Sequence, residues 1–177
     1  MQLAKLLAMV SLLATAALCS PAEARAVTCT PGSSAVPFYR AYANSVGDHF
    51  YTTDVNEYNN AVVNLGFSPE GISSRIFAGS ADGTTVLYRL YSGKEGDHFY
   101  TTSSAEVNSA VTSSGYTLEG VAGYVYPGAS CGAVPFYRLY SSKIGDHFYT
   151  TSVAERDNAV NSLGFKLEGV AAYVLSA

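Results

Sequence analysis

The chain contains no tryptophan, and only 14% of its 177 residues are charged. Its 10 Lys and Arg residues are outnumbered by 14 Asp and Glu residues, which gives a formal net charge of −4. This shortage of basic side chains disfavours nucleic-acid binding, which needs many cationic contacts to phosphate. Hydrophobic residues nevertheless make up 48% of the chain, so intrinsic disorder is also disfavoured. The length indicates one domain or two small ones.

The N-terminal apolar run is shorter than the ~20 residues of a membrane-spanning helix. It lies within residues 2–18, where Lys5 precedes about a dozen mostly apolar residues. Small residues that follow it allow cleavage after Ala24 or Ala26, as in a secretory signal peptide. We expect residues 1–24 to be this leader, residues 25–35 an N-terminal segment, and the mature chain to be secreted and extracellular without a transmembrane segment.

Cysteine is scarce, with three copies in the whole chain. Cys19 lies in the predicted leader, so Cys29 and Cys131 would remain in the mature protein. Two cysteines alone cannot build a four-ligand structural zinc site. A pair in an oxidising compartment favours a disulfide over two unrelated buried thiols.

A long motif recurs without insertion or deletion. GDHFYTT begins at Gly47, Gly96 and Gly145, a constant spacing of 49 residues. Such a period indicates a repeat architecture whose units pack against one another. We expect one repeat domain over residues 36–177. Its predicted repeats are 36–84, 85–133 and 134–177.

Each repeat is predicted to form strand, strand, helix and strand. In the third repeat, apolar and aromatic residues at 134–140 and 146–151 indicate a hairpin. Ser152 and Glu155 fit a capping box, in which each side chain accepts a hydrogen bond from a free amide at the helix start. Gly164 suits the helix end, and a third strand is expected around 167–175 with a bulge at Gly169.

We therefore predict an α+β fold of three 49-residue units. Closure into a pseudo-threefold, propeller- or trefoil-like ring would remove exposed sheet edges. The Cys29–Cys131 disulfide would then fasten the ring where its ends meet. An open solenoid of three units is the alternative.

The repeat PFYRLYS…GDHFYTT…AER…GF..EGVA.YV, over residues 36–177, resembles a family of secreted domains of undetermined function. Members of that family occur alone in fungi and bacteria or are appended to extracellular hydrolases. The resemblance implies an extracellular accessory or binding role that involves carbohydrate or cell wall. It implies no catalytic residue.

The GDHFY segments supply the candidate ligand-binding residues. Within each strand the Phe and Tyr should face opposite sides, with Phe in the core. The Tyr would either line a groove and stack on sugar or pack between units. The acidic group would accept hydrogen bonds from sugar hydroxyls. The candidates are Asp48, His49, Tyr51, Asp97, His98, Tyr100, Asp146, His147 and Tyr149.

Two chemical alternatives concern the histidines. Three imidazoles on a threefold axis could hold Zn²⁺ with one open position. A His next to a carboxylate could act as a general base, but adjacent strand residues point apart and no nucleophile is paired with a base. We expect neither a cofactor nor catalysis, and a structural role for the imidazoles. The residues concerned are His49, His98 and His147.

A repeated Arg on a mostly apolar strand needs a carboxylate partner if it is buried. We expect structural ion pairs of Arg with Glu, or with the Asp of the GDH motif, rather than an anion-binding site. The predicted residues are Arg40, Arg89, Arg138, Glu70, Glu119 and Glu168.

The combined expectation is a secreted, non-catalytic, lectin-like protein. Up to three related sites would bind glycans or cell-wall polysaccharide with gains in avidity. An extracellular protein-interaction module, such as an inhibitor or effector, is the first alternative, and a small secreted hydrolase is the second.

Overall fold

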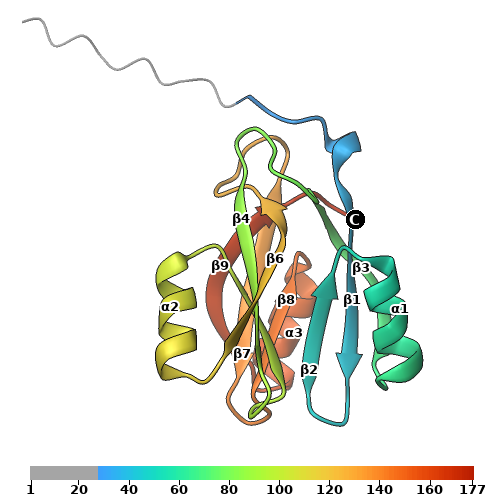
Figure 1. The fold of residues 1–177 in the computed structure, drawn as a ribbon, viewed down its shortest axis with the longest axis vertical. Coiled ribbons are helices and arrows are strands. Elements are labelled where there is room, and N and C mark those ends of the chain that lie inside the picture. The colour runs from blue at the N-terminus through green and yellow to red at the C-terminus, as the bar shows by residue number, and fades with distance from the viewer. Residues whose placement is uncertain (1–27) are drawn as a thin grey trace, which may run out of the picture.

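The computed structural model describes residues 28–177, so the predicted signal peptide and Cys19 lie outside the described residues. Within this range the fold is mixed, with nine strands and three α helices (Figure 1). Unit 1 covers residues 36–76, unit 2 covers 85–125 and unit 3 covers 134–174. The elements are β1 Val36–Ala43, β2 Asp48–Thr52, α1 Val55–Asn64, β3 Ser68–Ile76, β4 Thr85–Ser92, β5 Asp97–Thr101, α2 Ser104–Ser113, β6 Thr117–Val125, β7 Val134–Ser141, β8 Asp146–Thr150, α3 Val153–Ser162 and β9 Lys166–Val174, with a short 3₁₀ turn at Gly32–Ser34.

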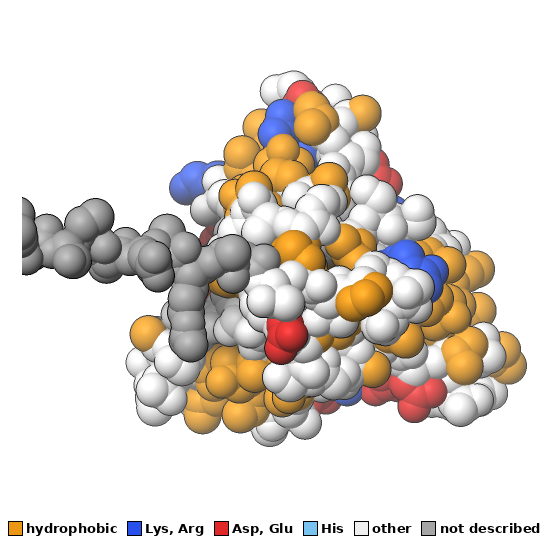
Figure 2. Space-filling model, turned by 90° about the horizontal axis from the view of Figure 1, so that it is seen from above, with side chains coloured by type: hydrophobic (Ala, Val, Ile, Leu, Met, Phe, Trp, Pro, Cys, Tyr) orange, Lys and Arg blue, Asp and Glu red, His pale blue; other side chains and the backbone are white. Residues whose placement is uncertain are grey.

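Every unit has the predicted order of strand, strand, helix and strand. Its three strands form one antiparallel sheet, in the orders β2-β1-β3, β5-β4-β6 and β8-β7-β9. The helices lie at the periphery and the strands between them (Figure 1). Seen along the perpendicular direction, from above, the outline is roughly triangular and few charged side chains reach that face (Figure 2).

The hairpin that joins the first two strands is set by a glycine. Gly47 has φ +81°, a left-handed conformation that side chains disfavour, and its amide donates to the Ala43 carbonyl at 2.8 Å. Gly96 and Gly145 repeat this turn with φ +70° and +76°. The glycine of each GDHFYTT motif therefore allows the hairpin turn, which sets the direction of the following strand.

The helix starts differ from the predicted capping box in one respect. The Ser152 hydroxyl accepts from the Glu155 amide at 3.2 Å, as expected. The Ser152 amide, however, donates to the Thr150 hydroxyl at 3.0 Å. Because Thr150 already satisfies that amide, the Glu155 carboxylate does not turn back to it, and it forms an ion pair with Arg40 of unit 1 at 3.0 Å. The predicted partner of the Glu155 carboxylate, the Ser152 amide, is therefore wrong.

The central core lies where the three sheets meet. Phe38, Leu87 and Phe136 pack there with the three GDHFY tyrosines. The motif phenylalanines, in contrast, lie between each sheet and its helix, where Phe99 contacts Val107 and Ala110. The predicted alternation of Phe and Tyr is present, but the tyrosines take the central core.

The sheets contact one another at the end opposite the hairpins. Isolated antiparallel bridges join Phe77 to Tyr124, Tyr126 to Tyr173, and Arg75 to Leu175. Each pair of units is thus joined by one bridge, while the three sheets remain separate three-stranded sheets. Closure into a propeller- or trefoil-like ring stays a prediction.

The expected disulfide is confirmed. Cys29 and Cys131 are bonded, with a sequence separation of 102 and 5.4 Å between their Cα atoms. It ties the segment before unit 1 to the loop before unit 3. Among the described residues, no helix is long and apolar enough to cross a membrane.

Candidate functional site

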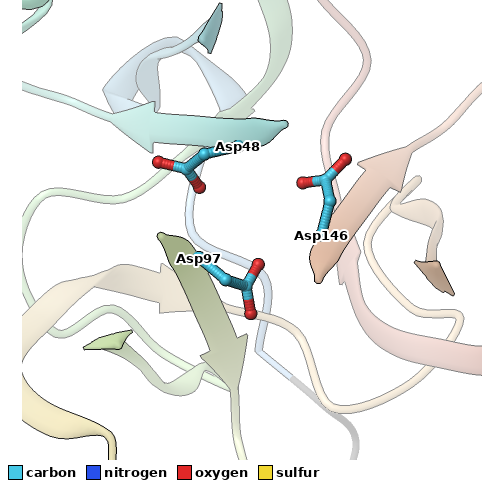
Figure 3. A group of neighbouring side chains, drawn as sticks. All are labelled: Asp48, Asp97 and Asp146. Carbon is cyan, nitrogen blue, oxygen red and sulfur yellow. The ribbon is translucent and has the colours of Figure 1, made fainter. Parts of the chain in front are cut away.

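The three motif aspartates gather at the hairpin end of the molecule. Asp48, Asp97 and Asp146 begin β2, β5 and β8, and their carboxylates surround a common centre (Figure 3). All three are buried, and one oxygen of each lies within 4.8 Å of the others. Sugar hydroxyls in solvent therefore have no access to these carboxylates.

Each aspartate is bound by the histidine of the next unit. Asp48 accepts from the His98 amide at 2.9 Å, and its second oxygen lies 2.7 Å from His98 Nδ1. Asp97 is bound in the same way by His147, and Asp146 by His49. Burial raises the pKa of Asp146, and the bonds from His49 oppose that rise.

This pairing shows why the three histidines do not converge on a metal. Their Nδ1 atoms point to carboxylates of neighbouring units, and in the described range only the aspartates come close enough together to share a cation. Each aspartate in turn already accepts two hydrogen bonds from a histidine, one on each carboxylate oxygen. The imidazoles therefore join units, which is a structural role.

The motif tyrosines form a closed set of hydrogen bonds in the central core. The Tyr100 hydroxyl donates to the Tyr51 carbonyl at 2.7 Å and accepts from the Tyr51 amide at 2.8 Å. Tyr149 binds Tyr100 in the same way, and Tyr51 binds Tyr149. All three side chains have 0% exposure. They cannot stack on a sugar. Of the two predicted roles for these tyrosines, packing between units is the one that the structure shows.

The expected arginine pairs are present and extend further than the sequence suggested. Arg89 Nε lies 2.8 Å from the Glu119 carboxylate of its own unit. Its two terminal nitrogens donate to both oxygens of Glu57, from α1 of the preceding unit, at 3.0 and 2.9 Å. We call such a set a Glu–Arg–Glu triad. The three triads are Glu57–Arg89–Glu119, Glu106–Arg138–Glu168 and Glu155–Arg40–Glu70.

The triads fix the ionisation of the helix glutamates. The hydrogen bond from Arg138 holds the pKa of Glu106 below its ordinary value, against the effect of partial burial. The Arg40 bond lowers the pKa of Glu155 in the same way. For Arg138 itself, burial is the largest single effect and pulls the pKa down, but the bond to Glu106 and the surrounding negative groups together outweigh it, so the pKa is raised. The arginine bonds therefore favour the ionised form of these helix glutamates.

A groove runs along each boundary between units, with a triad across its middle. In the groove between units 2 and 3, one cavity of about 220 Å³ is lined by Phe99, Ser109, Ser114, Tyr116 and His147, together with the triad. A second cavity of about 250 Å³ lies on the other side of the triad, between residues 101–103 and 169–171. We call the two together groove 2/3.

The other two boundaries repeat this arrangement. Groove 1/2 has cavities of about 190 and 180 Å³ on either side of its triad. Groove 3/1 has a cavity of about 170 Å³ beside its histidine. One sequence signal could have identified these sites. The capping-box Glu and the strand Arg recur with the same 49-residue period as the GDHFYTT motif.

The grooves differ in their lining. Ser114 and Tyr116 of groove 2/3 stand where groove 1/2 has Leu65 and Phe67. Because Ser114 is smaller than Leu65, the cavity beside it is larger, about 220 Å³ against about 190 Å³. The Tyr116 hydroxyl also donates to Asp97 at 2.5 Å, which no phenylalanine can do.

One known family covers nearly all of the described chain. Residues 37–175 match the model of a family described as a domain of unknown function, DUF5648. The chain belongs to this family. The DUF5648 match begins in β1 and ends just after β9, so it takes in all three grooves. No curated protein matches the chain, and no solved structure does.

Proposed function

We propose that the protein is a secreted, non-catalytic carbohydrate-binding protein whose three related sites are the grooves between units. The observation that carries this proposal is the recurrence of one groove composition at three boundaries. Each site combines an aromatic ring, a guanidinium, two carboxylates and an imidazole. A concave surface with a few converging polar groups is typical of a ligand site.

The groups in these grooves suit sugar hydroxyls. Carboxylates accept hydrogen bonds, while Arg and amide side chains donate them in fixed directions. Asn60 and Asn158 add amides at the rims of grooves 1/2 and 3/1, where groove 2/3 has Ser109. The cavities are smaller than the ~300–1,000 Å³ of sites for drug-sized ligands. This size favours a narrow ligand that takes one ring per cavity.

The ionisation of the glutamates supports binding without catalysis. A glycosidase needs one carboxylic acid whose pKa is raised so that it can donate a proton. Glu106 and Glu155 have lowered pKa values because of their arginine partners. The same pairing holds both side chains against movement toward a substrate.

Three sites on one rigid body would act together on a repeating surface. Linked weak sites gain avidity without any new contact when the geometry allows simultaneous binding. The bridge between each pair of sheets supports a closed threefold arrangement, which would space the three sites regularly. The disulfide supports an extracellular location, where such bonds persist.

A stoichiometry experiment tests the proposal. A broad glycan array selects an oligosaccharide, and isothermal titration then counts its sites on the wild-type protein and on groove-filling variants. Ser109→Trp, Asn60→Trp and Asn158→Trp each place a bulky ring at one exposed rim position. We expect each to remove one of three sites, and the triple variant to remove binding.

Asn108→Trp is the matched control. It places the same ring at the next exposed position of α2, and Asn108 lines none of the described cavities. Its stoichiometry should equal that of the wild type. A blank array, or oligosaccharide binding that all three groove-filling variants retain, would refute the proposal. Capture of a protein partner with a blank array would favour the protein-interaction alternative.

A further inference from the structure

Each groove contains more negative than positive charge. A triad has two carboxylates and one guanidinium, so it keeps one uncompensated negative charge. In groove 2/3 the remaining ionisable pair is His147 with the buried Asp97 behind it. If His147 is protonated, that pair is neutral and the groove keeps its single excess charge. If His147 is neutral, the excess is larger. Both states leave the groove acidic.

The side of the triad that faces a ligand is also the acidic side. In groove 2/3 the side chains of Glu106 and Glu168 are 41% and 31% exposed, whereas that of Arg138 is 15% exposed. The triads of Arg89 and Arg40 have the same order, with arginine exposures of 19% and 11% against 30–43% for the glutamates. A ligand in any groove therefore meets carboxylates first.

The shape of the groove selects an elongated ligand. The two cavities of groove 2/3 share Glu106, Arg138 and Glu168, so a molecule that fills both must cross the triad. One end would contact Phe99 and Tyr116, and the other would lie beside residues 169–171 of β9. At the crossing point, the exposed groups are the two carboxylates.

We propose that the preferred ligand is an oligosaccharide of amino sugars with free, protonated amines, such as the glucosamine oligomers of deacetylated chitin. This inference rests on the proposed carbohydrate function and specifies its ligand class. An ammonium group has three N–H donors and no acceptor, which complements two carboxylates that have acceptors only. Because each ring of the oligomer has one amine, a chain that crosses the triad places an ammonium at the carboxylates.

Three sugar oligomers with the same glycosidic linkage test the preference for free amines. Glucosamine, N-acetylglucosamine and glucose form β-1,4-linked oligomers of equal length that differ only at carbon 2. At a pH where the amine is protonated, we expect the glucosamine oligomer to bind at least about ten-fold more tightly than the other two, equivalent to about 1.4 kcal/mol. Its affinity should fall as salt is added, and that of the glucose oligomer should not.

Matched variants connect the preference to the groove. Glu168→Gln removes one groove carboxylate and keeps an oxygen that can accept from Arg138. We expect it to weaken binding of the glucosamine oligomer several-fold more than that of the glucose oligomer, because a neutral hydroxyl can still donate to the amide oxygen whereas an ammonium loses the charge of its partner. Glu95→Gln removes one charge at a hairpin tip of similar exposure, 40%, outside the described grooves, and should change neither. Thermal unfolding verifies that both variants fold.

The possible outcomes separate this inference from the proposed function. If the glucose or N-acetylglucosamine oligomer binds as tightly as the glucosamine oligomer, the amine preference is refuted and carbohydrate binding stands. If none of the three binds and the glycan array is blank, both proposals are refuted. A tetralysine peptide that binds as tightly as the glucosamine oligomer would refute a sugar-specific site, because simple attraction of cations would then explain the result.

Discussion

The hydrogen-bonded tyrosines of the central core give the sharpest test of how the three units are held together. The Tyr100 hydroxyl serves both the amide and the carbonyl of Tyr51. All of these groups are buried at the meeting point of the sheets. Replacement of Tyr100 by Phe removes only the hydroxyl oxygen and keeps the ring contacts. The substitution therefore isolates the two hydrogen bonds.

The expected loss of stability follows from the groups left behind. A buried polar group without a partner costs about 1–3 kcal/mol. Tyr100→Phe leaves one amide and one carbonyl of Tyr51 without this partner, so the free energy of unfolding should fall by about 2–6 kcal/mol. For a chain of this size about 1 kcal/mol corresponds to 2–4 °C in Tm, so Tm should fall by at least about 4 °C.

Chemical denaturation followed by circular dichroism measures this loss. Tyr58→Phe is the matched control, because Tyr58 is a partly exposed helix residue whose ring stacks on Tyr39. It should change the free energy of unfolding by less than about 0.5 kcal/mol, as most surface substitutions do. An equally small change for Tyr100→Phe would refute the conclusion that the hydroxyl completes a buried network between units.

Two further predictions concern the covalent link and the triads. Joint replacement of Cys29 and Cys131 by serine should lower the free energy of unfolding by about 2–5 kcal/mol, because the disulfide closes a long loop. If the denaturation midpoint of the wild type is unchanged under reducing conditions, this prediction is wrong. Glu106 has a pKa held below 4.5 in the folded state, so its contribution to stability is present above that value and is lost as the pH falls through its lowered pKa. Denaturation at neutral and acidic pH should show a flatter pH dependence for Glu106→Gln than for the wild type, and identical slopes would contradict the pairing with Arg138.

Much of the local structure could be predicted because it depends on short sequence signals. Turn glycines, helix caps and alternating aromatic residues act over a few positions, and the exact 49-residue period repeats each signal three times. Strand β7, for example, was expected at 134–140 and is found at Val134–Ser141. The disulfide was predicted from the number of cysteines together with the expected secretion.

The candidate site could be predicted only in part, since its contacts cross between units. The pairing of Arg89 with Glu119 lies within one sheet and was expected, whereas its pairing with Glu57 depends on where α1 packs against the next unit. Asp48 was assigned to a ligand because a carboxylate can accept hydrogen bonds from sugar hydroxyls. Its actual partner, His98, is 50 residues further along the chain.

The sequence by itself determined that the protein consists of three similar units, what elements each contains, and which side chains share a face. Strand alternation separates Phe50 from Tyr51 but does not say which of the two faces meets another unit. Only the tertiary structure decided that, because the edge strands β2, β5 and β8 meet at the centre of the molecule and bury Tyr51 there. Because this packing buries the motif tyrosines, the polar side chains that a ligand can reach lie in the grooves between units, where Arg and Glu from different repeats meet.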